Sequence, residues 1–507
     1  MNTDEPANVS MAQSVDQWVN DVTARVSAGD RFAGMFGSAQ PDGCRVTALL
    51  AGPDGMDAQH ALVSEDSAGR LSYPSLTPQI PSAFWYERAA HDLSGLQPEG
   101  HPRPDPLLLS VHEGNDHPRP GNGSNPDQRY QLRSTTPTGP VDVQGRGMFA
   151  MSLGPVRSGV FESIEFLIET PGEDIPHINI RPHYKHRGVA KSFEGLTAED
   201  GVLDAERVEG IASVAHAVAF SHAVERATNT PVPLRAQLLR LIHAELERIS
   251  NHLDVAMRLT EAAGLAVATS RFGWHKESVM RLTSRLCGSR FGRGVVVPGG
   301  VRHEPLIDLG QARTDLLVTL GKVRADATLA MRTPSFLDRL RGTGYLAPSH
   351  AQAWGALGPV GRASGVNDDN RWNRPTDAYA MFASEWEPAA AEDGDVMARL
   401  RVRWMEIDVA GSMALAAINT FGKTAGPLRT DIPAVSGRAL GLGWTEAPQG
   451  ETVYAVEMQD DRIVRCFARS ASFHNLVLFH EIYHGDVLTD FAFNEASFGL
   501  GYAAVAM

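Results

Sequence analysis

Apolar residues recur with a helical period along one long stretch near the middle of the chain. They follow one another at steps of three or four residues: Leu238, Ile242, Leu246, Ile249, Leu253 and Met257. Such a stripe covers one face of an α-helix. Gly264 suits the residue after a helix end, because glycine adopts the left-handed conformation at low cost. The pattern predicts a helix over 235–264, about 40 Å long at 1.5 Å per residue, as the spine of a domain.

Other stretches carry shorter patterns. Helical spacing predicts helices over 277–288 and 303–329, and a short one over 84–95. Apolar runs of strand length occur at 44–52, 60–66 and 161–170. The first part of the chain therefore mixes strands with a short helix, whereas the second part is mainly helical.

A segment rich in Gly, Pro, Asn and Asp separates these two parts. Residues 113–147 hold no apolar period, which is typical of a linker or an extended wrapping segment. The length of 507 residues also exceeds what one hydrophobic core usually supports. We therefore predict an α+β protein with a small α+β domain over 1–112, a linker over 113–147 and a mainly helical domain over 148–507.

Charge and hydropathy narrow the function classes. The net charge of -14, from 46 Lys+Arg against 60 Asp+Glu, argues against a general nucleic-acid binder, which needs a positive field. It is compatible with a place in a larger assembly. No run of about 18 apolar residues predicts a transmembrane helix, and the acidic start of the chain lacks the features of a signal peptide. We expect a cytoplasmic protein that only a partner could hold at a membrane.

The motif His-Glu-Ile-Tyr-His at 480–484 has the spacing of a zinc-peptidase helix. Two histidines on one face of a helix over 473–485 could meet one ion, with Glu481 as general base. A third ligand would have to come from the short remainder of the chain: Asp486, Asp490 or Glu495. The alternative is an ordinary helix end, where the dipole favours a cationic His484. We expect no metal site here and keep a zinc peptidase as a remote alternative.

Thiolate chemistry is restricted by cysteine spacing. Cys44, Cys287 and Cys466 lie far apart in sequence, and the chain has no Cys-x-x-Cys pair. This spacing excludes a disulfide scaffold. It also excludes an iron–sulfur or nickel site fed by paired thiolates of this chain alone.

Several polar groups have both a functional and a structural interpretation. Glu209 precedes the apolar run 211–220, so its carboxylate is either buried with a shifted pKa or simply starts a helix. His216 fits a hydrogen-bonded core histidine, and Glu245 and Glu247 fit a solvated helix face.

Two basic or glycine-rich motifs also remain open. The Gly-rich stretch 288–301 lacks the pattern of a phosphate-binding loop and is predicted to be a turn between packed helices. Arg290 and Arg293 within it could anchor an acidic group or a partner. The motif His-Tyr-Lys-His-Arg-Gly at 183–188 could line a polar cavity, contact a neighbouring subunit or form a solvated loop.

Several of these motifs occur in order in a known family. Residues 73–109 resemble the signature of the small peripheral-arm subunit of respiratory complex I, its C-type component, which is also found fused in formate hydrogenlyase large subunits. Later segments resemble the large subunit of membrane-linked nickel–iron hydrogenases (formate hydrogenlyase and hydrogenase-4 type), which is homologous to the D-type component of complex I at the quinone site. These segments are 154–169, 182–195, 206–225, 235–253, 288–301 and 472–491.

The resemblance implies a metal centre that this sequence does not support. Active relatives have Cys-Gly-Ile-Cys where this chain has Glu-Gly-Ile-Ala at 209–212. They close with Asp-Pro-Cys-x-x-Cys near where this chain has 499–504, which contains no cysteine. Other side chains do not supply comparable soft bridging ligation. The glutamate that usually follows the His-Arg-Gly motif is Ala190 here. We therefore expect a member of the subgroup that lacks the nickel–iron site.

The quinone site of the complex I relatives is also altered. The histidine that helps to bind the quinone head group corresponds to Arg157, and its partner tyrosine corresponds to Val208. An aspartate near the end of the long helix corresponds to Ala262. The resemblance nevertheless implies a peripheral subunit at the inner face of the cell membrane. Its expected partners are an iron–sulfur subunit like the B-type component of complex I, membrane-arm subunits and, as a further option, quinone.

Two hypotheses follow. In the first, the chain is a redox subunit of a respiratory complex (NADH–quinone oxidoreductase or formate hydrogenlyase type), and electrons from the iron–sulfur partner reduce a small acceptor in the old cavity. Arg157, His186, Arg187 and Glu209 are then the candidate catalytic residues. In the second, the cavity is chemically silent and the fold bridges the iron–sulfur subunit to the membrane arm. Under both hypotheses we expect no cofactor on this chain and no hydrogenase activity of its own.

Overall fold

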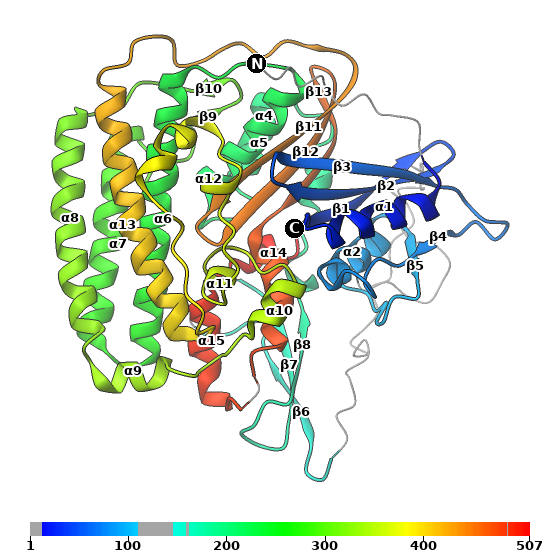
Figure 1. The fold of residues 1–507 in the computed structure, drawn as a ribbon, viewed down its shortest axis with the longest axis horizontal. Helices are drawn as coiled ribbons and strands as arrows, with labels where there is room; N and C mark the ends of the chain where they lie inside the picture. The colour runs from blue at the N-terminus through cyan, green and yellow to red at the C-terminus, as the bar shows by residue number, and fades with distance from the viewer. Residues whose placement is uncertain (1–12, 110–144, 159–161, 484) are drawn as a thin grey trace.

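The computed structural model describes residues 13–109, 145–158, 162–483 and 485–507. Most of the predicted linker, 113–144, lies outside the described residues. The fold is α+β, and the two parts that the sequence predicts are both present. Figure 1 shows a smaller blue part beside a larger part that contains a helical bundle.

The N-terminal part is built around an antiparallel sheet in the order β1-β2-β3. Its strands are β1 (Arg31–Gln40), β2 (Gly43–Gly52) and β3 (Gly55–Val63), and the helices α1 (Val15–Ser27) and α2 (Phe84–Ser94) pack nearby. A short parallel pair is formed by β4 (Leu71–Pro74) and β5 (Leu96–Glu99). The strands predicted at 44–52 and 60–66 and the short helix at 84–95 are confirmed.

Four long helices stand side by side and form the bundle of the larger part (Figure 1). They are α6 (Leu234–Ala262), α7 (Ala266–Cys287), α8 (Leu309–Ala330) and α13 (Val396–Phe421). The predicted spine is α6, and its apolar stripe is buried against the other three helices. Two starts differ from the prediction: α7 begins eleven residues before 277, and α8 begins at 309 because Asp308 caps it.

Two three-stranded antiparallel sheets complete the larger part. The first comprises β11 (Val435–Ala447), β12 (Gly450–Asp460) and β13 (Arg462–Arg469), and α5 (Ser213–Ala227) packs directly on β11 and β12. The second comprises β6 (Phe149–Leu153), β7 (Glu165–Thr170) and β8 (His177–Arg181), and it projects from one end of the molecule (Figure 1). Apolar periodicity identified β7 but none of the first sheet.

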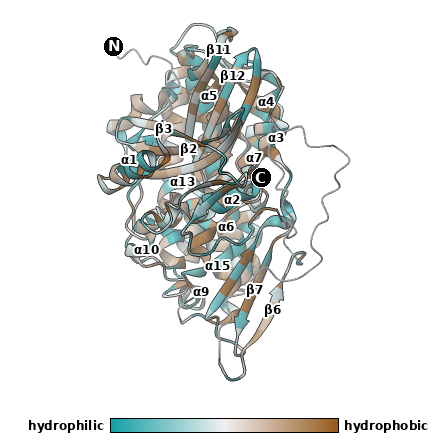
Figure 2. Cartoon of the chain, turned by 90° about the vertical axis from the view of Figure 1, so that its right-hand side faces the viewer, coloured by the Kyte–Doolittle hydropathy of each residue, from teal (hydrophilic) through white to brown (hydrophobic). Residues whose placement is uncertain are grey.

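Short elements connect these layers. They are α3 (Val189–Ser192), α4 (Ala198–Ala205), β9 (Val296–Val297), β10 (Gly300–Val301), α9 (Pro334–Leu340), α10 (Pro348–Ala353), α11 (Gly358–Arg362), α12 (Asn370–Asn373), α14 (Ala471–Leu476) and α15 (Phe491–Phe498). In Figure 2 apolar and polar residues intermingle along the outside of the fold. None of the helices in the described part of the chain is long and apolar enough to cross a membrane.

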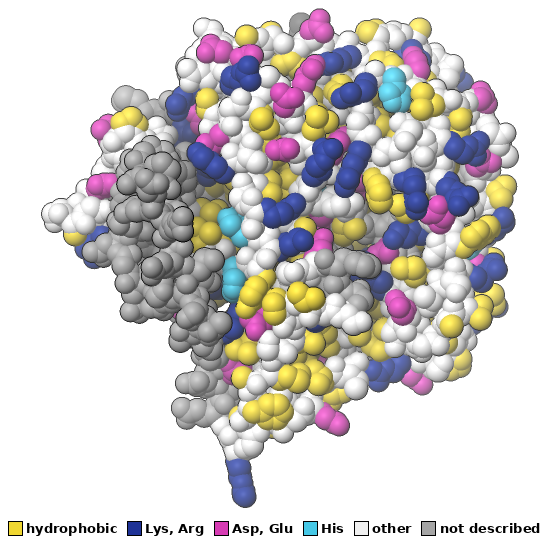
Figure 3. All heavy atoms as spheres, turned by 180° about the vertical axis from the view of Figure 1, so that it is seen from behind, with side chains coloured by type: hydrophobic (Ala, Val, Ile, Leu, Met, Phe, Trp, Pro, Cys, Tyr) yellow, Lys and Arg dark blue, Asp and Glu magenta, His cyan; other side chains and the backbone are white. Residues whose placement is uncertain are grey.

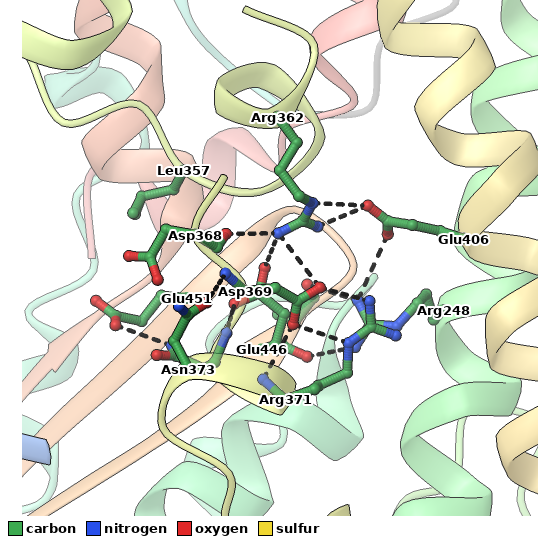
Figure 4. A network of polar contacts seen from close by, with 12 residues as sticks. Arg248, Leu357, Arg362, Asp368, Asp369, Arg371, Asn373, Glu406, Glu446 and Glu451 are labelled. Atoms are coloured by element: carbon green, nitrogen blue, oxygen red, sulfur yellow. Dashed lines mark hydrogen bonds and ion pairs between the residues drawn. The ribbon is translucent and has the colours of Figure 1, made fainter. Parts of the chain in front are cut away.

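A buried network of charges holds α6, α11, α12, α13 and β11 together (Figure 4). Arg362 at the end of α11 contacts Glu406 of α13 at 2.6 Å and Glu446 of β11 at 2.8 Å. Arg371 of α12 contacts Asp369 at 2.6 Å and Glu245 of α6 at 3.1 Å. Because these groups are buried, each charge is stabilised by a partner of opposite sign.

The same network reaches the N-terminal part. Arg31 of β1 contacts Asp368 at 3.0 Å and Glu451 of β12 at 2.5 Å. Attraction from Glu451 and Asp368 outweighs the effect of burial and raises the pKa of Arg31. The ion pairs therefore join the two parts of the chain as well as the layers within the larger part.

Candidate functional site

The last residues of the chain, 499–507, form the centre of the candidate site. The C-terminus lies inside the outline of the molecule in both ribbon views (Figures 1 and 2). α15 ends at Phe498, and Gly499 turns the chain with a φ of 65°. Residues 501–506 are buried. Small residues dominate this segment, so it packs closely between other elements.

Glu209 lies in the turn before α5 and is 1 % exposed. Its carboxylate accepts a hydrogen bond from the Ser472 hydroxyl at 2.5 Å and faces His216 Nε2 at 3.2 Å. Gly501 packs against the same carboxylate, and a β-carbon at 501 would lie 2.5 Å from Glu209 Oε1. His216 also contacts the Tyr454 hydroxyl at 2.8 Å. The carboxylate is thus held by its own chain, and His216 is the hydrogen-bonded core histidine that the sequence predicts.

His186 and Arg187 bind the main chain of the C-terminal segment. His186 Nδ1 donates to the carbonyl of Ala506 at 2.6 Å. The Arg187 guanidinium donates to the carbonyl of Ala503 at 3.0 Å and to that of Val208 at 2.7 Å. Together the two side chains tie the C-terminal segment to the turn that carries Glu209.

Arg157 is anchored on the other side of the segment. Its guanidinium forms a two-pronged ion pair with Glu495 of α15, at 2.5 and 3.1 Å. The Tyr502 hydroxyl donates to the same carboxylate. Burial opposes the charge of Arg157, but the hydrogen bonds and attraction of Glu495 outweigh it and raise the pKa of the guanidinium. Arg157 also lies over the Phe166 and Phe491 rings.

The structure brings the four predicted residues together around a segment of chain, whereas the sequence predicts that they line a cavity. Each of the four makes a hydrogen bond or ion pair to the C-terminal segment or to residues that pack on it. The physical reason is the composition of 499–507, because glycine and alanine leave room for the chain itself.

Further groups of the site escaped sequence reasoning. Glu162 accepts a hydrogen bond from the Ala503 amide at 2.7 Å. Burial, and secondarily the nearby Glu209, raise the pKa of Glu162. Ser472, Glu495 and Tyr502 complete the surroundings. No motif marks these residues, because their roles arise only when distant segments meet.

The residues present do not fit a nickel–iron centre. Cys44 lies in β2, Cys287 ends α7 and Cys466 lies in β13, and each is buried in a different layer. Burial raises the pKa of the Cys287 and Cys466 thiols, which disfavours the thiolate that binds a metal. Within the described ranges, no group of three or more His, Cys, Asp or Glu side chains has the geometry of a metal site.

The helix predicted over 473–485 is wrong. α14 ends at Leu476 and a 3₁₀ turn over Val477–His480 follows, so the chain has left the α-helical path before the motif begins. Glu481 contacts His480 at 2.9 Å and His350 at 3.0 Å. His484 lies outside the described residues. The described part of the motif therefore has no helical face on which the two histidines would converge.

The solvated face predicted for Glu245 and Glu247 is also wrong. Glu245 is buried and contacts Arg248 at 3.0 Å. Glu247 accepts hydrogen bonds from the amides of Val214 and Ala215 at 2.7 and 3.0 Å. It thereby satisfies the first N–H groups of α5, whose own N-cap residue is an alanine.

Glu247 makes the stability of the protein depend on pH. Burial raises its pKa to about 8, so the folded state keeps a proton that the unfolded chain releases near pH 4.5. Stability therefore falls as pH rises from about 4.5 to about 8. We expect Glu247→Gln to remove this contribution, so that the variant gains more in melting temperature over the wild type at pH 8 than at pH 5. An equal gain at both pH values would contradict the assignment.

Comparison with known proteins gives two matches to protein families. Residues 27–120 match the family described as respiratory-chain NADH dehydrogenase, 30 Kd subunit, and residues 266–436 match the family described as respiratory-chain NADH dehydrogenase, 49 Kd subunit. The two matches lie in one chain and in this order.

Similar proteins carry names of the same kind. Formate hydrogenlyase subunit 5 of Escherichia coli is 29% identical over 434 residues, which are 84% of this chain and 75% of the relative. The membrane-bound hydrogenase subunit alpha of Pyrococcus furiosus is 29% identical over 359 residues, 66% of this chain and 82% of the relative. The fused C/D component of the NADH-quinone oxidoreductase of Acinetobacter baumannii is 26% identical over 390 residues, 72% of this chain and 63% of the relative.

A solved structure shares the fold. A chain in the structure of the membrane-bound sulfane sulfur reductase, an archaeal respiratory membrane complex, matches with a TM-score of 0.66 and 22% identity. The match covers 73% of this chain and 100% of that chain.

Proposed function

We propose, from the premise that this chain belongs to the family of fused 30-kDa and 49-kDa subunits of the respiratory-chain NADH dehydrogenase type, that it is the large subunit of a membrane-associated respiratory oxidoreductase complex without a nickel–iron site. Its role there is structural: it couples an iron–sulfur subunit to a membrane arm. Partner subunits hold it at the inner face of the membrane.

One observation supports the structural role above the others. The four polar groups that would serve an active cavity are hydrogen-bonded or ion-paired within the chain, around the C-terminal segment 499–507. A catalytic group needs a free position within about 3 Å of a reacting atom. Glu209 and Arg157 instead direct their hydrogen bonds to Ser472 and Glu495.

A redox role of the same subunit is the second candidate. It draws support from the protonatable groups near the segment, since burial raises the pKa of Glu162 and Glu209 lies close to it. Carboxyl groups with raised pKa values serve as proton carriers near neutral pH. In this alternative, Arg157, His186, Arg187 and Glu209 would serve an acceptor that displaces the segment.

Electron transfer in the assembled complex distinguishes the two roles. We expect Glu209→Gln and Arg157→Ala to keep the turnover of the purified complex within about twofold of the wild type, because the proposed role assigns them no chemistry. A loss of about a hundredfold or more, the size expected for a general acid or base, would favour the redox role. Asp338→Asn, on the exposed face of α9, is the matched control, and subunit content is measured for each variant.

Elemental analysis tests the missing metal site. We expect the isolated complex to contain no nickel attributable to this chain, because its three cysteines lie in three separate layers. Stoichiometric nickel bound in this polypeptide would contradict the proposal.

A further inference from the structure

Four arginines gather beside the candidate site. Lys and Arg side chains are concentrated on the face seen in Figure 3, although the whole chain carries a net charge of -14. Arg207, Arg293 and Arg302 surround the carboxylate of Glu206, and Arg187 donates to the carbonyl of Arg207 at 3.1 Å. None of these four arginines, the arginine patch, forms an ion pair with a described residue.

The carboxylate of Glu206 within the patch does not neutralise it. Glu206 is 2 % exposed and accepts a hydrogen bond from the Gly294 amide at 2.5 Å. Burial raises its pKa. Arg207 and Arg302 are exposed, so their charge faces outward. The patch therefore keeps an excess positive charge at neutral pH.

An apolar recess adjoins the patch. A cavity of about 80 Å³ lies between α6, α7 and the turn before α5, and its apolar lining consists of Ile211, Val214, Leu246, Met280 and Phe291. Phe291 is 49 % exposed at this cavity, and the Arg293 guanidinium lies 5.4 Å from its ring centre. Gly292 packs against Val214, where a β-carbon would approach to 2.5 Å. Patch and recess are thus one continuous surface.

This combination has the anatomy of a protein interface. Stable interfaces place an aromatic or apolar anchor in a pocket and surround it with charged residues, among which arginine is enriched. An excess of positive charge selects an acidic partner, because potentials across interfaces are complementary. A membrane surface would not use the recess, which is large enough for the end of one apolar side chain.

We propose that the arginine patch and the Phe291 recess together bind the acidic face of another protein subunit, which inserts an apolar side chain into the recess. The proposal rests on the proposed function in one respect, namely that the partner belongs to the same complex.

Charge reversal in the native complex tests the patch. We expect Arg207→Glu combined with Arg293→Glu to lower the recovery of the partner with this chain at least about tenfold, equivalent to about 1.4 kcal/mol of binding. Arg313→Glu, on the exposed face of α8, is the matched control and is expected to leave recovery unchanged. Replacement of acidic residues of the partner by lysine is expected to restore binding to the double variant.

A photo-reactive phenylalanine analogue at position 291 gives a second readout that does not depend on the variants folding well. We expect it to cross-link to one subunit of the complex, at a peptide that carries carboxylates. The same analogue at Trp274, an exposed aromatic elsewhere on α7, is expected to give no adduct with that peptide.

Failure of this inference and failure of the proposed function give different results. A complex that assembles with position 291 free of cross-links, or with both reversed arginines in place, contradicts the surface inference alone. An adduct with lipid, or binding of the wild type to phosphatidylglycerol vesicles that the double variant loses, assigns the patch to the membrane and overturns the inference. A chain that purifies without any partner contradicts the proposed function and the inference together.

Discussion

Replacement of Arg362 by methionine is expected to lower the free energy of unfolding by about 3–5 kcal/mol, the usual effect of removing one partner from a buried ion pair. Arg362 is fully buried between Glu406 and Glu446 (Figure 4). Burial alone would raise the pKa of Glu406, but attraction from Arg362 holds it well below its usual value. Without the guanidinium, Glu446 loses its nearest cation in a buried site.

Denaturant unfolding of the wild type and the variant measures this effect. Arg401→Met is the matched control, since Arg401 lies on the same helix as Glu406 but is exposed, and its contact with Asp393 is 3.5 Å long. Exposed pairs of this kind contribute at most about 1 kcal/mol. Equal losses of stability in the two variants would show that the buried network has no special weight.

Replacement of Gly443 by alanine is expected to destabilise the protein by about 3 kcal/mol, at the upper end of the range for overpacking a core. β11 lies so close to α5 at this point that a β-carbon at 443 would overlap the carbonyl oxygen of Ala219 and the amide of Ala223. The obstacle is helix backbone, which cannot rotate away as a side chain does. The strand and helix would have to separate, and contacts between β11 and α5 would be lost.

Gly321→Ala provides a control of opposite sign. Gly321 lies inside α8 and is exposed, and among the described residues no neighbouring atom lies within 4 Å of the position that a β-carbon would take. Alanine there is expected to stabilise the helix by about 1 kcal/mol, because glycine has the poorer helix propensity. Thermal unfolding of both variants tests the contrast, and a Gly443→Ala protein as stable as the wild type would contradict the close packing.

The long helices were predictable because their signal is local. The stripe from Leu238 to Met257 identifies α6 to within about two residues, and Gly288 marks the end of α7. The first sheet of the larger part was not predictable in this way. β12 is buried along most of its length between α5 and the N-terminal part, so its residues do not alternate between apolar and polar.

The candidate site shows the same division. Sequence motifs pointed to Arg157, His186, Arg187 and Glu209 as residues of one region, and the structure does bring them near one another. They could not reveal that residues 499–507 lie between these groups, because those contacts join positions some 300 residues apart, such as His186 with Ala506. The surroundings of Glu247 were misjudged for a related reason, since its hydrogen-bond donors belong to another helix.

Local order thus determined which segments of this protein become helices, which family they resemble and which cysteine ligands are missing. Tertiary structure alone decided what surrounds each polar side chain: a charged network in the core, a C-terminal segment between the candidate residues and four arginines that form no ion pair within the described part of the chain. The physical reason is that propensity and periodicity act within a few turns of chain, whereas burial and ion pairing depend on which distant segments meet.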